Sequence, residues 1–203
     1  MRDIEALHEN IRKCTRCISC GYPISLPPIA GGVAPAPFML IGQAPSVSDL
    51  RNHAMYTGPA GRRLIGWLKI AGFTDEDFGS AVYLTAITKC FPGRPIGKST
   101  DRAPTAKERS NCRPWLDAQI QIVNPQVVIL FGKMAINAFL PGATLDEAVG
   151  GEIVKDGIIY IPLPHSSGAS TWLNDPAREQ LLQQAISIIR ERRIAIMPTV
   201  PLK

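Results

Sequence analysis

The chain of 203 residues is 45% hydrophobic and 19% charged, and its 22 basic and 17 acidic side chains give a formal net charge of +5. That length is typical of a single domain with its own core, so we expect one domain over residues 1–203. No apolar run approaches the roughly 20 residues of a membrane-spanning helix, and the first 14 residues lack the apolar stretch of a secretion signal. We therefore exclude a membrane protein and expect a cytoplasmic one. A modest positive charge is compatible with a nucleic-acid partner but does not require one, and no obligate protein partner is evident.

Helices and strands are predicted to alternate along the chain. Ile4, Leu7 and Ile11 have helical spacing and predict a helix over 2–13, whereas the Pro- and Gly-rich residues 20–37 predict an irregular wrap. Short apolar runs then predict strands, and amphipathic stretches predict helices; the strands are 38–41, 81–88, 126–131 and 158–163, and the helices 62–72, 105–123, 132–141 and 176–192. Asp156-Gly157 predicts a hairpin that joins 152–155 to 158–163, and residues 196–203 are expected to form a tail. This order predicts a three-layer α/β/α fold around a mainly parallel sheet of about four strands.

Cysteine is the most informative residue type. Of the five cysteines, Cys14, Cys17 and Cys20 form a double C-x2-C run, and Cys90 and Cys112 follow later. An odd number of cysteines without an export signal argues against a disulfide framework, and crowding of this kind in a reducing compartment favours metal binding. The alternative is that these are ordinary small core residues.

Unusual sequence follows three of the predicted strands. These segments are 42–45 (GQAP), 89–93 (KCFPG) and 164–168 (PHSSG). In a parallel sheet the three segments share one rim, where open α/β sheets bind their ligands. The sequence therefore predicts a site at this rim.

Together these motifs resemble the uracil-DNA glycosylase superfamily, and most closely its iron–sulfur branch, which includes the family 4 enzymes. The resemblance depends on the order of the parts: C-x2-C, a strand leading to G-[QE]-x-P, the run 56–61 (YTGPAG) opening a helix, a strand ending in Lys-Cys, a cysteine before Arg-Pro-Trp, and a strand leading to a His-Ser loop. No single part is decisive, but together they extend from Cys14 to about Arg193.

The resemblance implies a metal centre. Family 4 enzymes hold a four-iron cluster with four cysteines, which map onto Cys14, Cys17, Cys90 and Cys112, so residues 1–37 would include a cluster-binding wrap. Four thiolates also suit a structural zinc ion. The spacing between Cys90 and Cys112 is longer than in family 4, which leaves Cys20 as a rival ligand below Cys17. Such a cluster is expected to be structural.

The resemblance also implies catalytic residues. His165 matches the histidine that donates a hydrogen bond to the departing base. Gln43 and Ala44 stand where relatives carry a carboxylate, so Gln43 is left to orient a water molecule. Asp49 is the nearest carboxylate and our candidate for positioning that water. The alternative for Asp49 is a helix cap or turn residue, and the alternative for His165 is a loop cap.

The base pocket implied by the resemblance departs from the family pattern. Tyr56 matches the aromatic residue on which a flipped base stacks. Ala86 replaces the asparagine that reads the uracil edge, and Ser46 replaces a bulky tyrosine of the most selective relatives. With Gln43 and Ala44, these residues form the expected base site, whose discrimination is reduced because a buried polar pairing is missing.

DNA contacts are expected at three places. Ser166, Ser167 and Gly168 belong to a loop similar to the one that wedges into the gap left by the flipped base. Arg62 and Arg63 near the start of a helix are expected to bind phosphate, together with Arg94, Lys98 and Arg102 of the insert after Cys90. The alternative for the insert is a solvated charged loop.

The expected function is removal of uracil, or a related deaminated base, from DNA as the first step of base excision repair. The reaction is expected to be monofunctional hydrolysis, because the motifs place no lysine as a Schiff-base nucleophile. One alternative is a catalytically weak, damage-sensing DNA-binding protein of the same fold, favoured by Gln43, Ala44 and Ala86. Another is a zinc-stabilised enzyme that acts on a free nucleoside or nucleotide.

Overall fold

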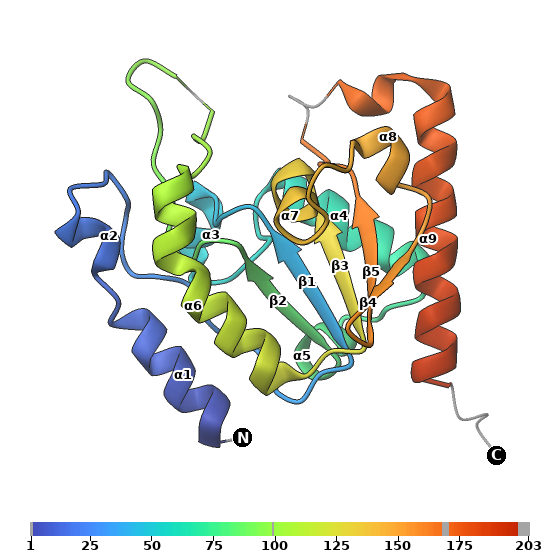
Figure 1. The fold of residues 1–203 in the computed structure, drawn as a ribbon, viewed down its shortest axis with the longest axis horizontal. Helices are drawn as coiled ribbons and strands as arrows, with labels where there is room; N and C mark the ends of the chain where they lie inside the picture. The colour runs from blue at the N-terminus through green and yellow to red at the C-terminus, as the bar shows by residue number, and fades with distance from the viewer. Residues whose placement is uncertain (1, 99, 168–170, 199–203) are drawn as a thin grey trace.

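A five-stranded sheet forms the centre of the protein. The computed structural model describes residues 2–98, 100–167 and 171–198, and the strand order is β2-β1-β3-β5-β4, with β4 antiparallel and the others parallel (Figure 1). The strands are β1 (Phe38–Gly42), β2 (Val82–Ala86), β3 (Val127–Phe131), β4 (Ile153–Lys155) and β5 (Ile158–Leu163). Every residue of β1 and β3 is buried, as expected for parallel strands covered on both faces. The predicted α/β class is confirmed; the sheet has five strands rather than about four, because the first arm of the predicted hairpin joins its edge as β4.

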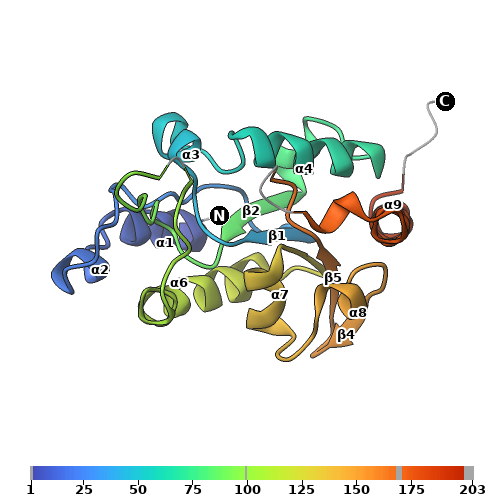
Figure 2. The same ribbon diagram turned by 90° about the horizontal axis from the view of Figure 1, so that it is seen from above.

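Helices cover both faces of the sheet, which gives three layers (Figure 2). Consecutive residues of a strand point to opposite faces, so Leu40 belongs to the same core as Leu64 and Ile186, whereas Met39 shares the other core with Leu116. The helices of the first face are α4 (Pro59–Ile70) and α9 (Pro176–Ile196), and those of the second are α1 (Arg2–Arg12), α6 (Ala106–Val123) and α7 (Lys133–Phe139).

Most predicted helices are present, with two kinds of difference. Short helices were not predicted; these are α2 (Arg16–Ser19), α3 (Val47–Asn52), α5 (Asp77–Ser80), α8 (Leu145–Ala148) and the 3₁₀ helix η1 (Trp172–Asn174). Helix α9 continues to Ile196, beyond the predicted end at 192 and into the expected tail, because Ile196 and Met197 pack against the core. Residues 199–203 of that tail lie outside the described residues. Within the described ranges, no helix has both the length and the apolar character needed to cross a bilayer.

Candidate active site and cysteine cluster

The three strand-end segments meet at one rim of the sheet, as predicted. Their residues line a cleft of about 610 Å³, within the range usual for small-molecule sites. The β1 end supplies Gln43, Ala44 and Ser46, and the β5 end supplies His165 together with the two serines that follow it. The start of α4 and the segment between β2 and α6 supply further lining residues.

His165 lies in this cleft in a neutral form with a defined proton position. The ring stacks on Phe131 with centroids 4.7 Å apart, and its Nδ1 accepts a hydrogen bond from the backbone N–H of Ser167 at 3.2 Å. The Ser167 hydroxyl lies 2.9 Å from the same Nδ1, and because the backbone N–H can only donate, these contacts favour the neutral tautomer with its proton on Nε2. Burial lowers the pKa of His165, which keeps the ring neutral. A Cβ added at Gly132 would lie only 3.2 Å from the Cδ2 atom of this ring, so the absence of a side chain at Gly132 leaves space for the imidazole.

Four hydrogen bonds occupy the carboxylate of Asp49. Its Oδ2 accepts the N–H and the hydroxyl of Ser46, both at 2.8 Å, and its Oδ1 accepts the N–H and the hydroxyl of Thr57, at 2.7 and 3.0 Å. Asp49 and Ser46 also form the capping box of α3. The side chain of Asp49 therefore caps helix α3, which was the alternative to a catalytic role. Its contact with a water molecule stays a prediction.

Tyr56 forms part of the cleft from a strained position. Its φ of +64° is unusual for a bulky residue, and its hydroxyl donates to the carbonyl of Thr85 at 2.7 Å. Burial raises the pKa of Tyr56 well above the usual value, so the phenol stays protonated. Its ring meets that of Phe131 edge to face, with centroids 6.3 Å apart. Ala86, by contrast, is buried in β2 and is not among the described residues that line the cleft.

The predicted DNA-contacting residues are placed around the cleft. Ser166 donates its hydroxyl to the carbonyl of Ala60 at 2.6 Å, and Arg63 donates to the carbonyl of Ser166 at 3.0 Å, so the loop after β5 is fastened to the start of α4. Ser167 lines the cleft, and Gly168 lies outside the described residues. Arg62 is exposed and donates to a backbone carbonyl nearby.

Two arginines of the insert are engaged in ion pairs. Arg94 lines the cleft and pairs with Asp101 at 2.8 Å, and Arg102 binds Glu108 at the start of α6. That pairing makes Arg102 a structural residue of the insert, whereas Lys98 is exposed.

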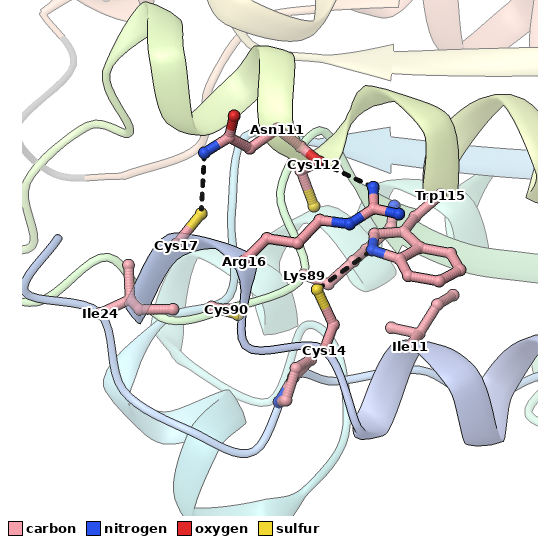
Figure 3. A pocket seen from close by; sticks show the side chains of 11 residues that line it. Ile11, Cys14, Arg16, Cys17, Ile24, Lys89, Cys90, Asn111, Cys112 and Trp115 are labelled. Carbon is pink, nitrogen blue, oxygen red and sulfur yellow. Dashed lines mark hydrogen bonds between the residues drawn. The ribbon is translucent and has the colours of Figure 1, made fainter. Parts of the chain in front are cut away.

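Four of the five cysteines line a single small pocket beside α1 and α6. Cys14, Cys17, Cys90 and Cys112 approach it from three separate parts of the chain (Figure 3), whereas Cys20 is exposed and does not line it. In the described residues, no three His, Cys, Asp or Glu side chains form a group that could hold a metal ion as they stand. Cys17, and not Cys20, therefore shares this pocket with the other three cysteines.

The chemistry of this pocket fits a thiolate-bound metal. The indole Nε1 of Trp115 donates to Cys14 at 3.3 Å, and the Asn111 amide lies 4.0 Å from the sulfur of Cys17. Burial, followed by repulsion from the other three thiolates, raises the pKa of Cys90 to about 12. Four thiolates in one pocket repel one another unless a cation binds them, and the two N–H donors are of the kind that tunes bound sulfur.

Sequence reasoning gave no role to two residues near these sites. Phe131 was interpreted only as part of a buried strand, although it supports the rings of both His165 and Tyr56. Lys89 belongs to the Lys-Cys motif, but the sequence does not predict that its side chain is completely buried. Burial lowers the pKa of Lys89 to about 8, and its ammonium donates to Thr85 Oγ1 at 2.8 Å. A lysine at the end of an apolar strand was the only signal available.

Comparison with known proteins identifies the class of this fold and site. A family described as the uracil DNA glycosylase superfamily matches residues 30–190, so the chain belongs to that superfamily and the resemblance is confirmed. It is 29% identical to a Type-4 uracil-DNA glycosylase of Thermotoga maritima over 68% of this chain and 67% of that protein. It is 26% identical to the Type-4 enzyme of Sulfurisphaera tokodaii over 98% of this chain and 87% of that protein. A Type-5 uracil-DNA glycosylase of Pyrobaculum aerophilum is 30% identical over 58% of this chain and 54% of that protein.

Proposed function

We propose that this protein hydrolyses the N-glycosidic bond of uracil, or of a related deaminated base, in DNA and so begins base excision repair. The observation that carries the proposal is the neutral His165, whose Nδ1 accepts a backbone N–H and whose Nε2 is thereby left as a donor in a cleft at the sheet rim. Membership of the uracil-DNA glycosylase superfamily supports the same reaction.

His165 would stabilise the leaving base. As the bond between sugar and base breaks, negative charge develops on the base oxygen, and the Nε2–H of His165 donates a hydrogen bond to it. A neutral donor can strengthen this bond as the charge grows without first giving up a proton. Water then adds its hydroxyl to the sugar, and its remaining proton neutralises the departing base. None of the described residues that line the cleft is a lysine that would attack in place of water.

Gln43 is the residue we assign to the water. It is half-buried at the β1 end of the cleft, and its amide oxygen is suited to accept a hydrogen bond from the attacking water. The four hydrogen bonds of Asp49 support a role as a positioning residue that holds the segment after Gln43, rather than direct contact with water.

The base would stack in the cleft beside Tyr56, next to Ala44 and Ser46. These two small side chains and the recessed Ala86 offer no pair of buried polar groups to the edge of the base, so the site should accept several deaminated bases. Ser166, Ser167 and Gly168 would contact the strand around the flipped nucleotide, while Arg62, Arg63 and Arg94 would contact its phosphates.

Base excision from oligonucleotides tests the proposal. Single- and double-stranded substrates carrying one uracil, hypoxanthine or xanthine are incubated with the protein, treated with alkali and analysed for strand scission. His165→Asn is expected to lower the rate by about a hundredfold or more, as loss of one such donor does elsewhere. The matched control is His53→Asn, the same change at an exposed histidine. The backbone of His53 is left-handed, with a φ of +50°, and asparagine tolerates that conformation. Binding of DNA with no scission of any substrate would instead support the damage-sensing alternative, with Gln43 and Ala86 as its cause.

We further propose that Cys14, Cys17, Cys90 and Cys112 hold a four-iron cluster, with a structural zinc ion as the alternative. When bound, such a cluster supplies a rigid cross-link and an electron-transfer centre, and here the first of these matters, because the four thiols join the N-terminal segment to the end of β2 and to α6. An odd number of cysteines, four of them gathered in one pocket, also supports a reducing compartment such as the cytoplasm.

Metal and sulfide content test the cluster directly. Cys112→Ser should lose the metal, whereas Cys20→Ser should keep it, because Cys20 lies outside the pocket. Iron, sulfide and a visible absorption band identify a cluster, and a colourless protein with one zinc supports the alternative. Retention of metal by Cys112→Ser would contradict the ligand assignment.

A further inference from the structure

The insert between β2 and α6 presents an isoleucine entirely to solvent. Ile96 is 103% exposed, the highest value among the exposed large apolar residues that the structure describes. It lies in a turn closed by a hydrogen bond from the Lys98 N–H to the Pro95 carbonyl at 3.0 Å, with Gly97 at a φ of +72°. Glycine tolerates that backbone conformation, so the turn holds Ile96 at its tip.

The base of the insert is held firmly. The Arg102 N–H donates to the Gly93 carbonyl at 3.0 Å, Arg94 pairs with Asp101 at 2.8 Å, and Arg102 binds the buried Glu108. Together these contacts hold the two arms of the insert against each other and attach them to α6. Ile96 is therefore presented from a braced loop.

The insert stands at the mouth of the cleft. Arg94, Thr100, Asp101 and Arg102 line the same cleft as His165. Figure 1 shows the segment that precedes α6 extending beyond the C-terminal ends of the parallel strands. The exposed Ile96 thus belongs to the same insert as four residues of the cleft lining, and the exposed Arg94 and Lys98 flank it in the sequence.

A flipped base leaves a gap in the duplex, and apolar side chains are the groups that minor-groove proteins insert between base steps. The segment 166–171 reads Ser-Ser-Gly-Ala-Ser-Thr and contains no large apolar side chain. We infer that Ile96 supplies this wedge: it enters the base stack of double-stranded DNA and holds the target base outside the helix, while the basic residues beside it bind the phosphates. This inference rests on the proposed function.

The test compares Ile96→Ala with Ile96→Leu on duplex and single-stranded substrates that contain uracil. Burial of an isoleucine side chain is worth about tenfold to a hundredfold in an equilibrium. We expect Ile96→Ala to lower kcat/KM on the duplex by about that factor and to leave the single strand unchanged, because a single strand has no stack to fill. Ile96→Leu should stay within about threefold of the original protein. The matched control is Val154→Ala, which removes an exposed β-branched side chain from the edge strand β4.

A binding experiment separates this inference from the proposed reaction. The duplex carries an uncleavable abasic site with 2-aminopurine beside it, and the fluorescence of the probe reports unstacking whether or not the protein cleaves DNA. A smaller fluorescence change and weaker duplex binding for Ile96→Ala support the wedge even if no uracil is excised. Equal behaviour of Ile96→Ala and the original protein on the duplex, or an equal loss on single and double strands, would overturn it.

Discussion

Replacing Asp49 by asparagine separates a structural role of this carboxylate from a direct role in catalysis. Asparagine keeps one oxygen, but it puts an NH₂ donor where the second oxygen accepted two hydrogen bonds. Either Ser46 or Thr57 then loses both of its contacts. Two hydrogen bonds to a charged group contribute about 1.5–3 kcal/mol each, or roughly 3–6 kcal/mol together. Because the hydroxyl of Ser46 or Thr57 can turn to accept from the new NH₂ group, part of this loss is recovered, and we expect a net loss of about 2–4 kcal/mol in the free energy of unfolding.

Thermal and urea unfolding followed by circular dichroism measure this loss. In a chain of about 200 residues, 1 kcal/mol corresponds to about 2–4 °C in Tm, so Tm should fall by about 4–16 °C. The control is Asp156→Asn, the same change at an exposed turn residue with a φ of +52°, which asparagine tolerates. The free energy of unfolding of this variant should stay within about 0.5 kcal/mol of that of the original protein. The rate of uracil excision, measured well below Tm, should fall much less than it does in His165→Asn. A variant of unchanged stability that loses about a thousandfold in rate would refute the reasoning and assign Asp49 to the water.

Other predictions concern the insert, helix α4 and the response to pH. Glu108→Gln removes the carboxylate that binds Arg102 and should cost about 3 kcal/mol in urea unfolding. Because Arg102 lowers the pKa of Glu108 to about 2, this difference should be complete above pH 4.5 and disappear as the pH falls toward 2, and a constant difference would contradict the pairing. Gly61→Ala should destabilise the protein, because the new Cβ would clash with the backbone of the preceding loop. In the same helix, the Cβ of Gly66→Ala meets no atom, so this variant should be more stable by up to about 1 kcal/mol. A change in Tm of the same sign for both variants would refute this contrast. Burial lowers the pKa of His165 below 6.5, so the unfolded chain binds that proton first and the free energy of unfolding should fall as the pH drops below about 6.5. Urea titrations should show a smaller fall for His165→Asn, and an identical fall would show that His165 does not titrate differently on folding.

Local signals in the sequence were sufficient for the larger elements. The capping box of Thr105 and Glu108 starts α6 where predicted, and Asp156-Gly157 joins the predicted hairpin. Both depend on residues within four positions of each other, so tertiary contacts are not needed to specify them. The short helices have too few residues to show a period, and the extra turns of α9 depend on the contacts of Ile196 with a distant core.

The sequence by itself determined the fold class, the shared rim, and the cysteines and histidine that belong to its motifs, because each is encoded by residue type, spacing and strand order. Only the tertiary structure decided what those side chains do. It occupied the Asp49 carboxylate with four hydrogen bonds, buried Ala86 outside the described cleft lining, left Cys20 out of the pocket that the other four thiols line and stacked His165 on Phe131. Such roles depend on which distant segment supplies the hydrogen-bond partner and on how much water is excluded, and neither is encoded in the local spacing of residues.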